Sequence, residues 1–355
     1  RAGITVCCLG VRLLTPIGSK QVNPITRKVL SPMTSIPLTF TYDLVLHPTP
    51  PFHFNGTVHK PSHFPSGDHA WEAGHYWQTM RFDGRIFGTR MIDQGTLEAP
   101  CIALRLYAAE EVTAVEAGRV TEELTFRLDL QADLSAFYHD PAGDTLLAPV
   151  FARWRGMRVM VDASLYEFLV IATVLQNATV RRSTQMLEAL FQNYGSRVIY
   201  DGKELYAYWP PEALCQATEE ELRALKVGYR AKQLKRQAEA FCTGALDVMH
   251  LRTLPSDLLK PILLDLYGVG PASVWYLLFE VFKRYDAFEY LSPWEQKIYS
   301  RLLFGEELVD AQKILDEVAA RWGRWKMLAA HMLFEDLFWR RQNEPVPWLE
   351  ELIRL

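Results

Sequence analysis

Leu266-Tyr267-Gly268-Val269-Gly270-Pro271-Ala272-Ser273 is the most informative stretch of the sequence. Two glycines two residues apart allow a tight backbone turn, and Pro271 suits the first position of a new helix because its missing N–H costs nothing there. The preceding residues, 256–266, begin with a Ser-Asp capping signal and carry leucines at helical intervals. The stretch therefore predicts a helix-turn-helix whose free N–H groups can bind a phosphate oxygen.

Two other interpretations of this turn are open. An ordinary helix-helix connection has the same local pattern. A dinucleotide-binding turn needs a strand before the glycines and a third glycine three residues on. Ser273 stands at that third position, and the residues before the turn have helical rather than strand periodicity. Helix-turn-helix fits better than strand-turn-helix.

The chain has 355 residues, enough for two or three domains at roughly 100–200 residues each. Alternating β-branched and aromatic residues separated by Gly, Pro and Asp turns predict strands in the first half. The expected strands are Thr39–Leu46, His75–Phe82, Arg85–Met91, Ala99–Tyr107 and Glu123–Leu130.

From about Ser164 the apolar period changes to that of helices. Beyond 165–195, helices are expected at Glu219–Lys226, Arg230–Phe241, Ser256–Leu266, Pro271–Phe282, Pro293–Leu303, Val309–Arg321 and Trp325–Arg341. The predicted fold class is α+β, with a tail of unknown role (1–38), a β-rich domain (39–155) and an all-helical domain (156–355).

Composition excludes a disordered or fibrous protein, since 49% of the residues are hydrophobic and 23% are charged. A net charge of −4 requires that any nucleic-acid-binding charge be local. One basic run is a candidate for that charge, and a solvated helix face is its alternative interpretation. It comprises Arg223, Lys226, Arg230, Lys232, Lys235 and Arg236.

The five cysteines show no pair at the two-residue spacing typical of zinc or iron-sulfur ligation. Neither a metal site nor a disulfide framework is expected. The apolar patch from Ile4 to Leu14 is too short to span a bilayer. An intracellular, cytoplasmic protein without membrane association is expected.

With these features in order, Leu266 to Ser273 resembles the hairpin of the helix-hairpin-helix (HhH-GPD) DNA glycosylase superfamily. Residues 165–195 are similar to the helix pair that opens the catalytic domain of that family, and residues 225–241 to the stretch before its hairpin. Residues 321–334 resemble the C-terminal helix of the bacterial alkylpurine (3-methyladenine) glycosylase II branch. The likeness covers residues 156–341, and the β-rich first half is compatible with that branch.

The resemblance implies a catalytic Asp about twenty residues after the hairpin, and here Ser292 occupies that position. Ser292-Pro293-Trp294-Glu295 is a good capping box, but a hydroxyl supplies no negative charge to a developing cation. Three interpretations stay open. A substitute acid is available in Glu295, Glu289 or Asp286, with Glu295 best placed although it also suits the role of capping partner. Alternatively, only bases that leave easily are removed, or damaged DNA is bound without cutting.

The resemblance also implies other site residues. The lyase lysine of some members falls at Ala272, which argues against a Schiff-base mechanism. Gln176 and Asn177 match the region that enters the duplex during base flipping, and a helix C-cap is the alternative for Asn177. Phe334 matches an aromatic residue that stacks on the flipped base, with plain core as the alternative. DNA contacts are expected at Gly268, Val269, Gly270 and Ser273.

The sequence therefore predicts a monofunctional DNA glycosylase of base-excision repair that hydrolyses the N-glycosidic bond of damaged, alkylated purines. The alternatives are a catalytically impaired damaged-DNA-binding protein on the same fold and, less favoured, a nucleotide-cofactor enzyme. The expected partner is double-stranded DNA carrying a damaged base, and the protein is expected to be a monomer. No cofactor or iron-sulfur cluster is expected, with a monovalent cation at the hairpin as the one option.

Overall fold

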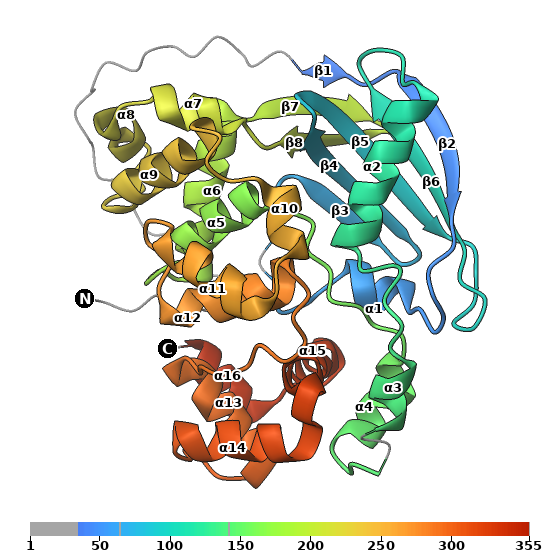
Figure 1. Cartoon of the computed structure of the whole chain (residues 1–355), viewed down its shortest axis with the longest axis vertical. Helices are drawn as coiled ribbons and strands as arrows, with labels where there is room; N and C mark the ends of the chain where they lie inside the picture. Colours follow the sequence, from blue (N-terminus) through green and yellow to red (C-terminus); the bar gives the residue numbers. More distant parts are fainter. Residues whose placement is uncertain (1–34, 64, 141–142, 355) are drawn as a thin grey trace, which may run out of the picture.

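The computed structural model describes residues 35–63, 65–140 and 143–354. A five-stranded antiparallel sheet in the order β2-β6-β5-β4-β3 forms the first part of the chain (Figure 1). Its strands are β2 (Phe40–Leu46), β3 (His69–Glu72), β4 (His75–Phe82), β5 (Arg85–Asp93) and β6 (Ile102–Ala108). Helix α2 (Ala114–Arg127) lies across this sheet, and the short helix α1 (Phe54–Val58) follows β2.

Helix α2 spans Ala114–Arg127, so the expected strand at Glu123–Leu130 is wrong. The helix begins with a capping box in which Thr113 and Glu116 satisfy each other's backbone N–H groups. Ala117, Val120 and Leu124 are then buried against the sheet at helical spacing. Because a capping signal precedes the apolar residues, this segment forms a helix rather than the expected strand.

A second sheet corrects the expectation of an all-helical second half. Strands β7 (Ser196–Tyr200) and β8 (Lys203–Ala207) form an antiparallel hairpin around Asp201 and Gly202, which both have positive φ. β1 (Ile36–Pro37) pairs in parallel with β7. The end of the expected tail is therefore a strand, whereas residues 1–34 lie outside the described residues.

The expected helices are otherwise confirmed, with small shifts at their ends. The segment expected as one helix over 271–282 is divided into α12 and the π-helical turn η1. The helices of the second half are α5 (Leu165–Leu175), α6 (Val180–Tyr194), α7 (Pro211–Gln216), α8 (Glu219–Ala224), α9 (Arg230–Cys242), α10 (Val248–Thr253), α11 (Ser256–Asp265), α12 (Pro271–Tyr276), η1 (Leu277–Val281), α13 (Pro293–Phe304), α14 (Ala311–Trp322), η2 (Gly323–Trp325), α15 (Lys326–Asn343) and α16 (Pro347–Arg354).

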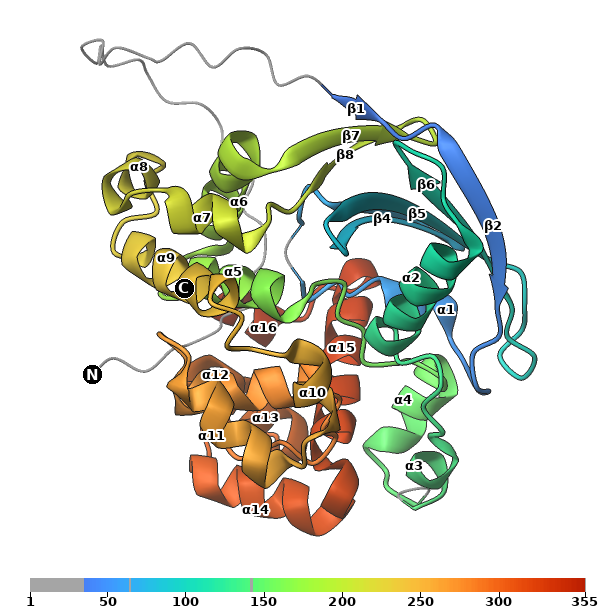
Figure 2. The same ribbon diagram turned by 45° about the horizontal axis from the view of Figure 1, so that its top comes forward.

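The helices form two groups, one of α5–α9 and one of α11–α16 (Figure 2). Helices α3 (Ser135–His139) and α4 (Leu147–Trp154) lie beside the second group, and their buried side chains share one apolar core with α15. Arg153 on α4 also forms an ion pair of 2.7 Å with the buried Asp336 on α15. The domain limits at 38/39 and 155/156 stay predictions.

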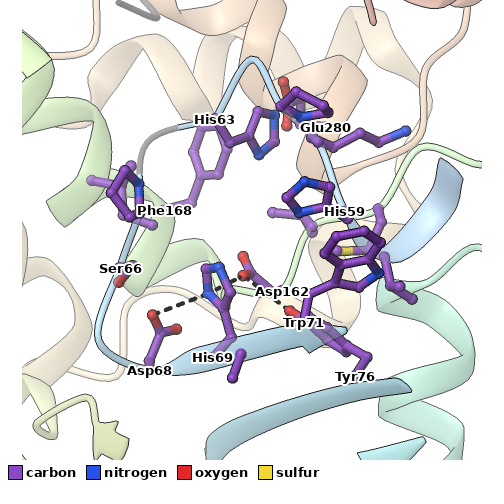
Figure 3. Close-up of a pocket in the computed structure, with 18 of the residues that line it drawn as sticks. His59, His63, Ser66, Asp68, His69, Trp71, Tyr76, Asp162, Phe168 and Glu280 are labelled. Atoms are coloured by element: carbon purple, nitrogen blue, oxygen red, sulfur yellow. Dashed lines mark hydrogen bonds and ion pairs between the residues drawn. The ribbon is translucent and has the colours of Figure 1, made fainter. Parts of the chain in front are cut away.

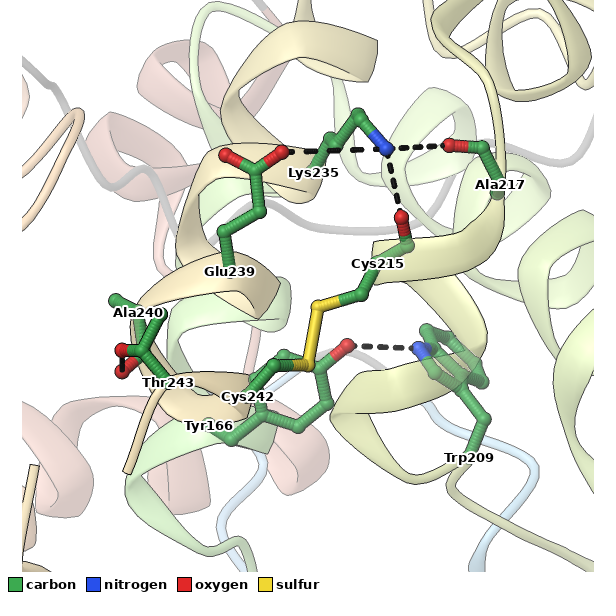
Figure 4. Close-up of a disulfide and its surroundings, with 9 residues drawn as sticks. All are labelled: Tyr166, Trp209, Cys215, Ala217, Lys235, Glu239, Ala240, Cys242 and Thr243. Atoms are coloured by element: carbon green, nitrogen blue, oxygen red, sulfur yellow. Dashed lines mark hydrogen bonds and ion pairs between the residues drawn. A yellow bond between two sulfur atoms is a disulfide. The ribbon is translucent and has the colours of Figure 1, made fainter. Parts of the chain in front are cut away.

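A disulfide between Cys215 and Cys242 joins the end of α7 to the end of α9 (Figure 4). Lys235 supports the same junction, because its Nζ donates hydrogen bonds to the carbonyls of Cys215 (2.7 Å) and Ala217 (2.8 Å). The expectation of no disulfide is wrong here, since the two cysteines are 27 residues apart and meet only in the fold. Cys101 is free and half-buried.

Among the described residues, no helix is both long enough and apolar enough to cross a membrane.

Candidate DNA-binding and base-excision site

The predicted hairpin connects α11 to α12. Gly268 has a φ of +83°, and a Cβ at this position would lie 2.3 Å from the Nε2 of the buried Gln233. Only glycine fits both the left-handed conformation and this close approach. Gly270 is the N-cap of α12 at an ordinary φ of −113°, and a Cβ there would meet nothing within 4 Å.

Backbone amides at the start of α12 are available for a ligand. Val269 N–H donates to the carbonyl of Leu266 (3.0 Å), and Ser273 N–H donates to the carbonyl of Gly270 (3.0 Å). Within the described residues, no backbone hydrogen bond from Gly268, Gly270 or Ala272 is recorded. Of the four residues expected at DNA, the two glycines keep free amides, whereas the amides of Val269 and Ser273 are engaged.

A narrow cleft beside the hairpin is lined by Phe168 and Gln176 from the α5 region and by Tyr276 from α12. Gln176 is buried at the C-cap of α5, and its carbonyl accepts a hydrogen bond from Arg230. Asn177 follows with a left-handed φ of +46° and is exposed, and its Nδ2 donates to the hydroxyl of Tyr229 (3.4 Å). Asn177 therefore occupies the left-handed position directly after the C-cap of α5, and its role in base flipping stays a prediction.

Ser292 is the N-cap of α13 and is 1% exposed. Its Oγ accepts from the N–H of Glu295 (3.2 Å), and Glu295 Oε2 accepts from the N–H of Ser292 (3.1 Å). The other oxygen, Oε1, accepts from the Tyr276 hydroxyl on α12. Burial raises the pKa of the Glu295 carboxyl.

The capping box expected from the sequence is thus confirmed, and it holds a carboxylate toward the hairpin helix. The other two acids, Asp286 and Glu289, are exposed. Among the three candidates for a substitute acid, Glu295 is the least exposed, being half-buried.

Phe334 lies in an aromatic cluster on α15. Its ring packs against Phe338 (centroids 4.9 Å apart) and against Trp294 (5.9 Å apart). It lines neither the cleft beside the hairpin nor the cavity next to that cleft. The stacking role expected for Phe334 stays a prediction, whereas its packing fits the core interpretation.

A cavity of about 440 Å³ opens next to the hairpin cleft, with which it shares Phe168 and Ala172 (Figure 3). The segment after α1, strands β3 and β4, the loop before α5, α5 itself, η1 and α15 contribute to its lining. One aromatic wall has His59 and Trp71 stacked at 4.0 Å with an interplanar angle of 8°. Glu280 reaches the cavity from η1, and burial raises the pKa of its carboxyl.

Sequence reasoning missed this cavity. Its lining comes from segments that are far apart along the chain, such as residues 58–63, 65–71, 160–162 and 280. Lys60 is a further example of a residue without a local signal. It is buried and donates to the carbonyls of Gly56 (2.7 Å) and Arg158 (3.2 Å), and burial lowers the pKa of its amine to about 8.

The basic run does not act as one patch. Arg230 is buried and Lys235 caps α7, as described above. Arg223 and Arg236 pair with Glu219 and Glu239 on their own helices. Lys226 and Lys232 are the members that are exposed and make no ion pair among the described residues.

No protein-family model matches the chain. Among curated proteins, it is similar to a probable N-glycosylase/DNA lyase of Methanothermobacter thermautotrophicus, with 22% identity over 212 residues, 54% of this chain and 67% of that protein. It is also similar to a DNA-3-methyladenine glycosylase of Bacillus subtilis, with 22% identity over 214 residues, 59% of this chain and 69% of that protein.

Two solved structures share the fold. The 3-methyladenine DNA-glycosylase of Archaeoglobus fulgidus superposes with a TM-score of 0.68 at 19% identity, covering 83% of this chain and 98% of that one. The 8-oxoguanine glycosylase/lyase of Clostridium acetobutylicum, in complex with double-stranded DNA, gives a TM-score of 0.60 at 19% identity and covers 84% and 98%. The chain therefore has the fold of the helix-hairpin-helix DNA glycosylases, the superfamily of the curated proteins and solved structures that it resembles.

Proposed function

We propose that the protein is a monofunctional DNA glycosylase of base-excision repair that releases alkylated purines from duplex DNA. The hairpin carries the proposal. It presents the amides of Gly268, Gly270 and Ala272 at the start of α12, where they can hold a phosphate of the DNA backbone. The cavity beside it, about 440 Å³, lies within the size range of small-molecule sites and can take an extruded base.

Hydrolysis without strand cleavage follows from Ala272. A lyase needs an amine that forms a Schiff base with the sugar, and the position of that lysine carries a methyl group here. The buried Lys60 does not replace it, because its amine is held by two carbonyl groups. In this respect the chain differs from its relatives that are named lyases.

The type of damaged base that the protein can release follows from Ser292 and Glu295, the capping residues of α13. Bond cleavage at C1′ leaves a cationic sugar, which a carboxylate stabilises by several kcal/mol. Ser292 supplies no such charge, and both carboxylate oxygens of Glu295 are already engaged, by the N–H of Ser292 and by the hydroxyl of Tyr276. The reaction is therefore suited to bases that leave easily, such as N-alkylated purines whose positive charge weakens the glycosidic bond. The aromatic wall of the cavity and the Glu280 carboxyl favour such cations.

The experiment is base release from methylated duplex DNA. We expect free alkylated purine and an abasic, unbroken strand, and no covalent adduct on borohydride treatment. Glu295→Gln tests the substitute acid, with the exposed Glu289→Gln as its matched control. Release that continues at the same rate in Glu295→Gln would remove Glu295 from the chemistry.

Ser292→Asp restores the carboxylate that the resemblance implies. If only this variant releases the base, while the unmodified protein binds the same DNA, the protein is a damage-binding relative without catalysis, and the proposal is wrong. A location inside the cell, in the cytoplasm with access to DNA, and a monomeric state are parts of the same proposal.

A further inference from the structure

Two aspartates and a histidine come together on the wall of the cavity. Asp68 directly precedes β3, His69 begins that strand, and Asp162 lies in the loop before α5 (Figure 3). His69 Nδ1 lies 3.4 Å from Asp68 Oδ1 and 3.2 Å from Asp162 Oδ2. One potential ligand atom from each residue lies within 4.8 Å of the other two.

Asp68 Oδ1 and Asp162 Oδ2 share the single His69 Nδ1 as their ion-pair partner (Figure 3). Asp68 Oδ1 and His69 Nδ1 are both buried, and neither has a hydrogen-bond partner of acceptable geometry among the described residues. The Asp68 side chain is 5% exposed. A buried carboxylate oxygen whose ion-pair partner lies 3.4 Å away and is shared with a second carboxylate is poorly satisfied, so it is suited to a further ligand.

We propose that Asp68, His69 and Asp162 bind a divalent transition-metal ion of the zinc type. Zinc takes imidazole nitrogen and carboxylate oxygen at about 2.0–2.2 Å, and tetrahedral geometry then separates the ligand atoms by about 3.3–3.5 Å. The two separations that include His69, 3.2 and 3.4 Å, match this spacing, and the carboxylate atoms of Asp68 and Asp162 lie within 4.8 Å of each other. Three protein ligands leave a fourth position for water, open to the cavity.

The backbone around the ligands is held in place by strand β4. The carbonyl of Asp68 accepts from the N–H (2.9 Å) and the Oγ1 (3.2 Å) of Thr79. The carbonyl of Asp162 accepts from Gln78 and from the buried Arg127 (2.9 Å). Ligands fixed in this way pay little entropy when the ion binds.

The imidazole distinguishes this set from a magnesium site, because Mg²⁺ prefers oxygen ligands in octahedral geometry. With neutral His69, a bound Zn²⁺ balances the two carboxylates and leaves the cluster without net charge. The cavity can therefore still take a cationic base beside Glu280.

The proposal of a metal site does not depend on the glycosylase function. It departs from the sequence expectation of no metal site, which rested on cysteine spacing alone.

The test is Zn²⁺ binding by the tag-free full chain after removal of metal with a chelator, followed by calorimetry. One ion per chain is expected, and Asp68→Asn and His69→Gln should each weaken binding by roughly 100-fold or more. His139→Gln is the matched control, because His139 pairs with Asp140 at an exposed site. Co²⁺ in place of Zn²⁺ should give the intense visible absorption of a four-coordinate site, and that absorption should be lost in Asp162→Asn.

Circular dichroism of each metal-free variant separates loss of a ligand from loss of folding. Binding that persists in folded Asp68→Asn and His69→Gln would overturn the proposal, as would no binding by the unmodified chain. In that case the cluster is an imidazolium held between two carboxylates.

Discussion

Gly268 and Gly270 have different physical requirements, although the sequence shows them as one pattern. Gly268→Ala forces a side chain into left-handed backbone and against Gln233, so it should lower the free energy of unfolding by about 1–3 kcal/mol. Gly270→Ala places its methyl group in open space and should change stability by less than about 1 kcal/mol. It should nevertheless weaken duplex binding at least tenfold, because the methyl group stands where the DNA backbone must approach. Chemical denaturation and fluorescence anisotropy measure the two effects.

Gly118→Ala is the control, since it adds a methyl group in open space on α2, in the first part of the chain. Its duplex affinity should equal that of the unmodified protein. Equal affinity of Gly270→Ala and Gly118→Ala would show that the hairpin is not the DNA contact.

The rate of base release is expected to depend on pH through the carboxyl of Glu295. Burial raises the pKa of its carboxyl, so the ionised form is lost at a higher pH than for an exposed glutamate. If the ionised carboxylate assists bond cleavage, base release should slow as the pH falls through this raised pKa, and Glu295→Gln should lose that dependence. Single-turnover rates across the acidic range provide the measurement. A profile of the same shape in both proteins contradicts this role.

At the scale of elements, the disulfide makes the α7–α9 unit a testable part of the fold. Closing a loop of 27 residues should stabilise the protein by about 3–4 kcal/mol through the entropy of the unfolded chain. We expect Cys215→Ser to lower the free energy of unfolding by about 2–4 kcal/mol under oxidising conditions and by much less in excess thiol. Cys101→Ser is the control, because Cys101 is free. A loss of the same size with and without thiol would show that the disulfide is not formed.

Elements with strong local signals were predictable from the sequence. The helices α11, α12 and α13 are found where expected, and α13 has the expected capping box. The Ser-Asp capping signal expected before α11 is wrong, because Pro255 is the N-cap and makes no side-chain cap hydrogen bond. The hairpin β7–β8 was missed because its strands have five residues each and are partly exposed, and it lies between the helices α6 and α7. β1 was not predictable, because two residues acquire strand geometry only by pairing with β7.

At the scale of the whole molecule, a buried ionic network joins α2 to the helical part. Glu123 forms ion pairs of 2.7 Å with both Arg127 and Arg252. Lys283 donates to the carbonyls of Arg127 (3.1 Å) and Val159 (2.8 Å). Removing one charge from such a network leaves its partners buried and unpaired.

The pKa of Glu123 is lowered from 4.5 to about 2, since its two arginines outweigh the opposing effect of burial. A carboxylate with a lowered pKa stabilises the fold above its unfolded value and loses that contribution as the pH falls toward the folded value. The group should therefore contribute about 3 kcal/mol at neutral pH, lost between about pH 5 and 2. Glu123→Gln should cost about 3–5 kcal/mol at neutral pH and flatten this part of the acid dependence, measured by denaturation at several pH values.

The exposed Glu122→Gln is the matched control and should keep the stability and acid dependence of the unmodified protein. If Glu123→Gln were as stable as Glu122→Gln at neutral pH, the network would not hold the two parts together.

The candidate site was only half predictable. The hairpin and the cap at Ser292 each lie within eight consecutive residues, so local chemistry reveals them. The cavity, the Tyr276–Glu295 contact and the Asp68–His69–Asp162 cluster each unite separate segments, and no periodicity or spacing encodes such a meeting. The basic run was predicted as one surface because its residues are close together in the sequence. In the fold, some of these side chains are exposed, Arg230 is buried, and Lys235 caps a helix.

The most direct test of the account is single-turnover release of alkylated purines from a methylated duplex by the unmodified protein. Release well above spontaneous depurination is expected, with an abasic site in an unbroken strand. Tight binding of the same duplex with release no faster than in buffer would contradict it.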